Sequence, residues 1–134
     1  MNLDKEIVNI KTRKPYIKSF PTEDEKTLAV NDKGVFDDNL LPKETVGNVI
    51  LNCLAMIPGE TKIHGFYANA IAQLIFGDER EIELKDKFKT FLSSHLEKSI
   101  IKTIKNGDKE EVRGLYAGWI ISQVLEEMGE DFEA

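Results

Sequence analysis

Histidine and cysteine are the residue types that most often supply nucleophiles and metal ligands, and this sequence contains two histidines and one cysteine. His64 falls near the start of an expected helix and His95 on the apolar side of another. Neither has a second histidine or a cysteine at metal-ligand spacing. Cys53 falls within an apolar stripe, where a free cysteine behaves as a small hydrophobe. The two histidines are therefore predicted to be partly buried or surface residues, and Cys53 is predicted to be a small core residue.

The carboxylates do not indicate an active site either. They occur as adjacent acids, in the groups Glu23-Asp24-Glu25, Asp78-Glu79, Glu110-Glu111 and Glu126-Glu127. Adjacent acids on a helix point in different directions and usually mark a solvated face or a first helical turn. The sequence also has no glycine-rich phosphate loop. We therefore expect no enzyme, no cofactor, no metal and no small-molecule ligand; a small enzyme with a dispersed site is the less favoured alternative.

Length and charge narrow the class of protein further. The 134 residues suit a single domain spanning residues 1–134, and a net charge of −6 disfavours nucleic acid as a partner, because phosphate contacts need a basic surface. A single cysteine cannot form an internal disulfide, and no apolar run reaches the ~18–20 residues that span a bilayer. The first residues are acidic where a signal peptide would be basic. These features predict a cytoplasmic protein without a membrane segment.

A local basic cluster near the N-terminus interrupts the acidic composition. It consists of Lys11, Arg13, Lys14 and Lys18, interleaved with Tyr16 and Phe20. Basic residues alternating with aromatic ones can hold single-stranded nucleic acid. Four such charges in an acidic chain more often form a solvated face, and that interpretation is favoured.

The N-terminal part of the chain is predicted to contain a short β-hairpin. Residues 1–25 form an arm whose structure the pattern does not define. In residues 26–36, Leu28 and Val30 alternate with polar neighbours, and the turn residues around Gly34 follow. This alternation predicts a hairpin that must pack on the helices, since a lone hairpin is marginally stable.

Residues 42–129 are predicted to form a helical core. Three-and-four spacing of apolar residues predicts a helix whose apolar positions run from Val46 to Ile57. Its start is left open by a few residues, because Pro42 suits a first helical turn and Thr45 suits an N-cap. A second helix is predicted from about Lys62 to Phe76, with Thr61 as its cap. Its expected core stripe consists of Ile63, Phe66, Tyr67, Ala70, Ile71, Leu74 and Ile75.

A third helix is predicted to begin near Asp86. It either continues to Lys105 or breaks near Ser93-Ser94, and both alternatives remain open. Asn106-Gly107-Asp108 ends it in either case. The acidic residues 130–134 are expected to form a frayed tail. The predicted fold is thus mainly α, a bundle of three or four helices with a short N-terminal β-hairpin.

The last predicted helix runs from Val112 to Met128 and is apolar nearly all round, which is typical of a helix buried on more than one side. Its bulky side carries Tyr116, Trp119 and Ile120. These residues either lie inside the fold or form an exposed apolar patch of the kind that binds partners. They are the candidate protein interface.

Three short segments from residue 30 onward follow a recurring order of elements: Thr45-Val46-Gly47-Asn48-Val49-Ile50-Leu51-Asn52-Cys53-Leu54, then Phe66 to Ile75, then Ile82-Glu83-Leu84. In this order and in these segments the chain resembles a loose group of small bacteriophage and prophage proteins. The resemblance implies a phage setting and no catalytic residue. The expected function is that of a non-enzymatic factor that binds a host or phage protein through an apolar or acidic surface. The alternative is a structural or assembly protein that works as a homo-oligomer through its last helix.

Overall fold

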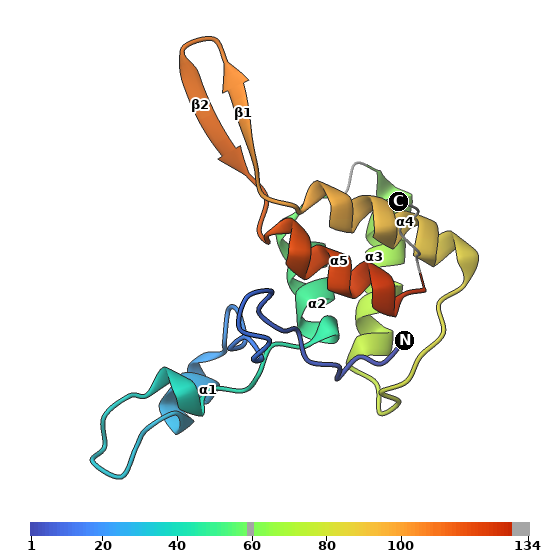
Figure 1. The fold of residues 1–134 in the computed structure, drawn as a ribbon. Coiled ribbons are helices and arrows are strands. Elements are labelled where there is room, and N and C mark those ends of the chain that lie inside the picture. The colour runs from blue at the N-terminus through green and yellow to red at the C-terminus, as the bar shows by residue number, and fades with distance from the viewer. Residues whose placement is uncertain (59–60, 130–134) are drawn as a thin grey trace.

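A computed structural model describes residues 1–58 and 61–129. Within these ranges it contains five α-helices and one two-stranded antiparallel sheet (Figure 1). The elements are α1 (Glu23–Leu28), α2 (Val46–Met56), α3 (Lys62–Ile75), α4 (Asp86–Lys98), β1 (Lys102–Asn106), β2 (Lys109–Arg113) and α5 (Gly118–Glu127). None of the described helices has the length and apolar character that crossing a membrane would need. The predicted tail, 130–134, lies outside the described residues.

Helix α2 is the centre of a body formed by α2 to α5, because it packs against each of the other three (Figure 1). Its inner face is fully buried and consists of Val46, Val49, Ile50 and Cys53. The Thr45 side chain accepts a hydrogen bond from the backbone N–H of Asn48 at 3.2 Å and caps the helix, as predicted. Helix α3 and its Thr61 cap also confirm the prediction.

The first residues of the chain complete the N-terminus of α2. The first N–H groups of a helix have no partner within the helix. Here the N–H of Val46 donates to the carbonyl of Lys5 and the N–H of Gly47 donates to the carbonyl of Leu3, both at 2.9 Å. A Cβ on Gly47 would lie 3.1 Å from that Leu3 oxygen, so glycine permits the close approach. The N-terminal arm is therefore part of the body, and Leu3 is fully buried in it.

The predicted N-terminal hairpin over residues 26–36 is wrong. Thr22 and Glu25 form a reciprocal capping box, in which each side chain accepts from the backbone N–H of the other, and this starts α1 where a strand was expected. One isolated antiparallel bridge between Val30 and Phe36 is all the pairing that residues 26–36 show. The helix-capping interaction between Thr22 and Glu25 therefore outweighed the alternation of apolar and polar residues that predicted a strand.

The described hairpin lies instead at residues 102–113 and projects from the helical body (Figure 1). Its register pairs Lys102 with Arg113, Thr103 with Val112, Ile104 with Glu111, Lys105 with Glu110 and Asn106 with Lys109. Gly107 and Asp108 form the two-residue turn between the paired Asn106 and Lys109, and Gly107 takes the left-handed φ of 67° that its turn position needs. The third helix begins at Asp86 as predicted and ends at Lys98, so neither of the two alternatives for its C-terminal end, Ser93-Ser94 or Lys105, is correct.

The last helix is shorter than predicted, since α5 begins at Gly118 and residues 112–113 belong to β2. Gly114 lies between β2 and α5 and has a φ of 104°. A Cβ at this position would lie 2.4 Å from the carbonyl oxygen of Ile100. Only glycine fits this conformation beside a backbone atom. Gly114 therefore sets the base of the hairpin and the direction in which the chain enters α5.

We predict that Gly114→Ala lowers the free energy of unfolding by at least about 2 kcal/mol, because it combines a strained φ with a clash against backbone. Urea denaturation followed by the fluorescence of Trp119, the single tryptophan, measures the loss. Gly107→Ala is the matched control. Gly107 also has a positive φ, but no atom lies within 4 Å of its added Cβ, so only the strain of about 1 kcal/mol is expected. Equal losses in the two variants would contradict the role of Gly114.

Candidate functional site

A buried carboxylate lies where the N-terminal segment meets α2. The Glu44 residue is only 2% exposed. Its Oε2 accepts hydrogen bonds from the Ser19 N–H at 2.9 Å and from the Ser19 hydroxyl. Its Oε1 accepts from the Asn48 side chain at 2.6 Å and from the Thr45 N–H at 3.2 Å. These four bonds replace the hydration that a buried charge loses.

The cluster extends to Tyr116 through a chain of hydrogen bonds with a defined direction. The only hydroxyl proton of Ser19 is directed at Glu44, so the Tyr116 hydroxyl must donate in the 2.7 Å contact with Ser19 Oγ. Asn52 in turn donates to Tyr116 Oη at 2.9 Å. The order of donation is Asn52, Tyr116, Ser19, Glu44. Such chains strengthen their members, and no buried side-chain nitrogen or oxygen of the described residues is left without a partner.

Burial raises the pKa of two groups beside this cluster. The pKa of Tyr116 rises to about 12, chiefly because burial penalises the phenolate; the charge of Glu44 adds to the rise, and the hydrogen bond that Asn52 donates to Tyr116 opposes it. Burial likewise raises the pKa of the Cys53 thiol to about 11. Both groups stay protonated at neutral pH. Neither is therefore poised as a base or a nucleophile.

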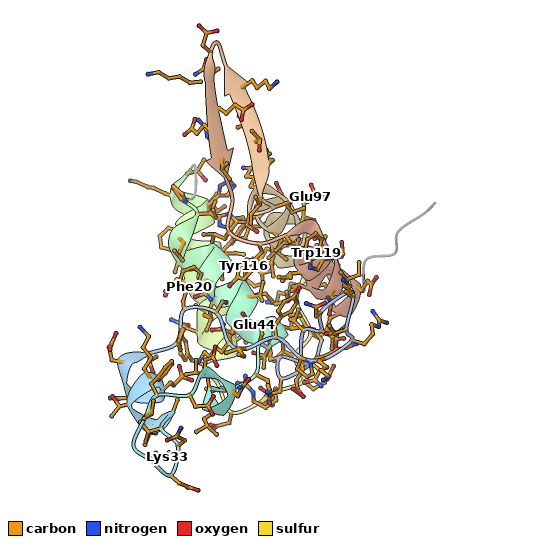
Figure 2. All side chains as sticks on the ribbon, turned by 60° about the vertical axis from the view of Figure 1, so that its left-hand side comes forward. Phe20, Lys33, Glu44, Glu97, Tyr116 and Trp119 are labelled. Atoms are coloured by element: carbon orange, nitrogen blue, oxygen red, sulfur yellow. The ribbon has the colours of Figure 1, made fainter. Side chains whose placement is uncertain are left out.

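The polar cluster holds the next residue, Phe20, in an unusual conformation. Phe20 has a φ of 50°, which costs of order 1–3 kcal/mol for a residue with a bulky side chain. Three interactions of Ser19 with Glu44 and Asn48 hold the backbone on its N-terminal side, including the 3.1 Å bond from the Asn48 amide to the Ser19 carbonyl. The Phe20 side chain is 53% exposed (Figure 2). The fold thus maintains an exposed aromatic ring at the cost of backbone strain.

Phe20 borders an open groove of about 520 Å³ between α2 and α3. Phe76, which is 78% exposed, also borders it. The apolar lining between them is made of Leu51, Leu54, Ala55, Ala68 and Ala72. Asn48 and Asn52 reach the groove from the polar cluster. We call this surface, from Phe20 to Phe76, the α2–α3 groove.

The two histidines come closer together than their sequence positions indicate. The rings of His64 and His95 both contact Phe91, with centroid distances of 5.1 and 5.3 Å. His95 Nε2 lies 3.0 Å from the Cys53 carbonyl oxygen, which can only accept, so this nitrogen carries the proton. Among the described residues no group of three or more His, Cys, Asp or Glu could hold a metal ion. His95 and Cys53 serve the core.

The structure separates the three residues of the predicted interface. Tyr116 precedes α5 and is buried in the polar cluster. Ile120 is partly buried against the core. Trp119 is 46% exposed and donates from Nε1 to Tyr16 Oη at 3.0 Å (Figure 2). Of the three, Trp119 is the one that presents a large surface to solvent.

Sequence reasoning assigned the large apolar side chains of α3 to the core, and the structure confirms only part of this assignment. Ile71 and Ile75 are buried as predicted. Ile63, Phe66 and Leu74 were expected inside and are exposed. The available signal was the width of the stripe, which covers more of the helix than a single packed face needs.

No protein-family model, no curated protein and no solved structure matches this chain.

We predict that Tyr116→Phe lowers the free energy of unfolding by about 1–2 kcal/mol, because it removes the hydroxyl that links Asn52 to Ser19. Chemical denaturation at neutral pH measures the change. Tyr16→Phe is the matched control, since the Tyr16 hydroxyl has a single partner at the surface and should cost less than about 0.5 kcal/mol. A larger loss in the control than in Tyr116→Phe would contradict the importance of the cluster.

The raised pKa of Tyr116 predicts a pH dependence of stability at alkaline pH. The unfolded chain releases this proton near the ordinary pKa of 10.0, whereas the folded protein retains it until about 12. The contribution of Tyr116 is therefore complete below pH 10 and decreases as the pH rises from 10 to 12. The difference in unfolding free energy between the natural protein and Tyr116→Phe, measured at several pH values, should shrink over this range. A difference that does not change with pH would contradict the prediction.

Proposed function

We propose that this protein is a non-enzymatic protein-binding factor whose α2–α3 groove receives an apolar segment of a partner protein. The observation that carries the proposal is the exposed pair Phe20 and Phe76, which borders an apolar groove with one ring held by a strained backbone. Exposed aromatic residues around a preformed apolar surface are characteristic of protein interfaces. Strain of this kind persists where the surrounding structure maintains it, and often at functional positions.

The shape and chemistry of the groove favour a helix or another regular apolar segment as its occupant. Ala68 and Ala72 are one turn apart on α3 and face Ala55 on the same groove lining. Small residues on both walls allow large apolar side chains of a partner to enter, in the way amphipathic helices bind grooves. Asn48, Asn52 and Asn69 also line the groove and could bind polar groups at the edge of the partner.

Helix α3 offers a second apolar strip on its outer side. Ile63, Phe66 and Leu74 recur at helical spacing and are all exposed. The polar residues Asn69 and Gln73 separate this strip from the groove by their position on the helix. The outer strip is therefore a surface separate from the groove, and the proposal concerns the groove alone.

The identity of the partner stays open between a host and a phage protein, and the phage setting rests on the resemblance of the sequence alone. A cytoplasmic location is part of the same proposal. It is supported by the free thiol of Cys53, which is buried and suits a reducing compartment.

The experiment compares capture of proteins from a bacterial lysate by the natural protein and by Ala72→Arg. Arginine at 72 places a long charged side chain in the open groove, so proteins bound there should be depleted at least about tenfold, as measured by quantitative mass spectrometry. Captured proteins that bind elsewhere on the molecule should be recovered equally with both forms, and they serve as the internal reference in the same eluates.

Gln73→Arg is the matched control, because it adds the same side chain to the next, exposed position of α3 outside the groove lining. Proteins retained by Gln73→Arg and lost from Ala72→Arg are groove ligands. If every captured protein binds both variants equally, the α2–α3 groove is not the binding site and the proposal is wrong.

A further inference from the structure

A second hollow, of about 550 Å³, lies between the N-terminal segment and α5. Ile10, Arg13 and Trp119 border it. Ile10 and Trp119 are both exposed, so the hollow has an apolar edge that the described part of the chain leaves open. The indole N–H is already bonded to Tyr16, which leaves the apolar ring surface for a ligand.

The loop beside this hollow is preformed. The Gln123 side chain accepts from the Val8 N–H and donates to the Val8 carbonyl, both at 2.9 Å, and so ties the loop to α5. Asn9 Oδ1 accepts from the N–H groups of Lys11 and Thr12 at 2.8 and 3.1 Å. Arg13 takes a positive φ of 60° within this tight turn. A preformed surface loses little entropy when it binds.

This loop, residues 9–14, is called the basic loop. It carries Lys11, Arg13 and Lys14 and no acidic residue. None of the three makes an ion pair with any residue that the structure describes. Lys5, Glu6 and Glu126 line the wall of the hollow, and Lys5 pairs with Glu127 at 3.2 Å, so the positive charge without an ion-pair partner belongs to the loop.

Residues 22–41, which we call the acidic lobe, carry exposed apolar side chains among acidic ones. Their charge is opposite to that of the basic loop. The lobe contains six acidic residues and two lysines and extends away from the helical body, with Lys33 at its outer end (Figures 1 and 2). Leu28 is 81% exposed. The other exposed apolar side chains of the lobe are Val30, Val35, Phe36 and Leu40.

The acidic lobe is also locally ordered. Lys18 pairs with Glu25 at 2.9 Å at its base. The Asn31 side chain accepts from the N–H groups of Lys33 and Val35 and closes the turn at its end. Its apolar residues are therefore held in place on a projecting structure, where a single chain does not cover them.

We infer that the hollow beside Trp119 binds the acidic lobe of a second copy of this chain. The basic loop has three uncompensated positive charges and the lobe has a net charge of −4, and each surrounds exposed apolar side chains. Complementary charge around apolar contacts gives an association its register and specificity. The lobe projects from its own body, which lets it reach a neighbouring molecule (Figure 1).

The contact joins two different surfaces of the chain, so it is compatible with two kinds of assembly. Two such contacts around a two-fold axis close a dimer, in which each basic loop receives the partner's acidic lobe. One contact repeated without closure gives a series of larger species. Either distribution contains the same loop–lobe pair.

The test is a charge exchange followed by sedimentation velocity. One variant reverses the loop by Lys11→Glu, Arg13→Glu and Lys14→Glu, and the other reverses the lobe by Asp24→Lys, Asp32→Lys and Asp38→Lys. All six positions are exposed and outside the core. At about 0.15 M salt the Debye length of about 8 Å screens the overall charge while contacting charges still interact.

The natural protein should self-associate within a range of about 10–500 µM, and each variant alone should associate at least about tenfold more weakly. An equal mixture of the two variants should recover the association, because each reversed surface then meets an opposite one. A natural protein that stays monomeric, or a mixture that stays monomeric, overturns the inference.

Matched controls separate the contact from net charge. Lys102→Glu, Lys105→Glu and Lys109→Glu on the hairpin make the same change in charge as the loop variant and should leave self-association unchanged. Leu28→Ser should weaken it, whereas Val112→Ser, also at an exposed apolar position, should not. Association that falls equally with the hairpin variant would assign the effect to net charge and overturn the inference.

The α2–α3 groove is tested separately. Ala72→Arg should leave self-association unchanged, and the loop and lobe variants should leave capture of groove ligands unchanged. Failure of one proposal is therefore distinguishable from failure of the other.

Discussion

The buried carboxylate of Glu44 is the constraint on which the other features depend. A charge removed from water must recover its hydrogen bonds from the protein, or folding loses several kcal/mol. Glu44 recovers them from Ser19, Thr45 and Asn48. Through Ser19 the same network includes Tyr116, where the chain passes from the hairpin to α5. One buried group therefore joins three segments that are far apart in the sequence.

This arrangement leaves two surfaces open. The N-terminal segment binds the first turn of α2, where its carbonyl groups accept hydrogen bonds from Val46 and Gly47. It does not cover the face of α2 that lines the α2–α3 groove, and Phe20 and Phe76 remain exposed at the border of this groove. The acidic lobe leaves the body between Ser19 and Glu44, the two ends that the network joins. A rigid core with exposed apolar extensions is the physical basis of the binding role that we propose.

Local signals explain both the correct and the wrong secondary-structure predictions. Helices α2 and α3 could be predicted because Thr45 and Thr61 cap apolar stripes of the right period. The hairpin expected at 26–36 failed because the Thr22–Glu25 capping box favours a helix there. The prediction of a long final helix was wrong because Gly107-Asp108 forms a hairpin turn, and the second strand of that hairpin contains Val112, which helical periodicity alone assigned to the helix.

The sequence by itself determined that helices α2 and α3 form, that Thr45 and Thr61 are able to cap them, and that Cys53 lies on a buried helix face. Only the tertiary structure decided that Ile71 is buried while Phe66 on the same helix is exposed, and that Tyr116 turns inward while Trp119 remains at the surface. Periodicity shows which side chains share a face of a helix. It does not show which face receives a neighbour, because burial depends on segments distant in the chain. Glu44 is the clearest case, since nothing local distinguishes a buried glutamate from a solvated one.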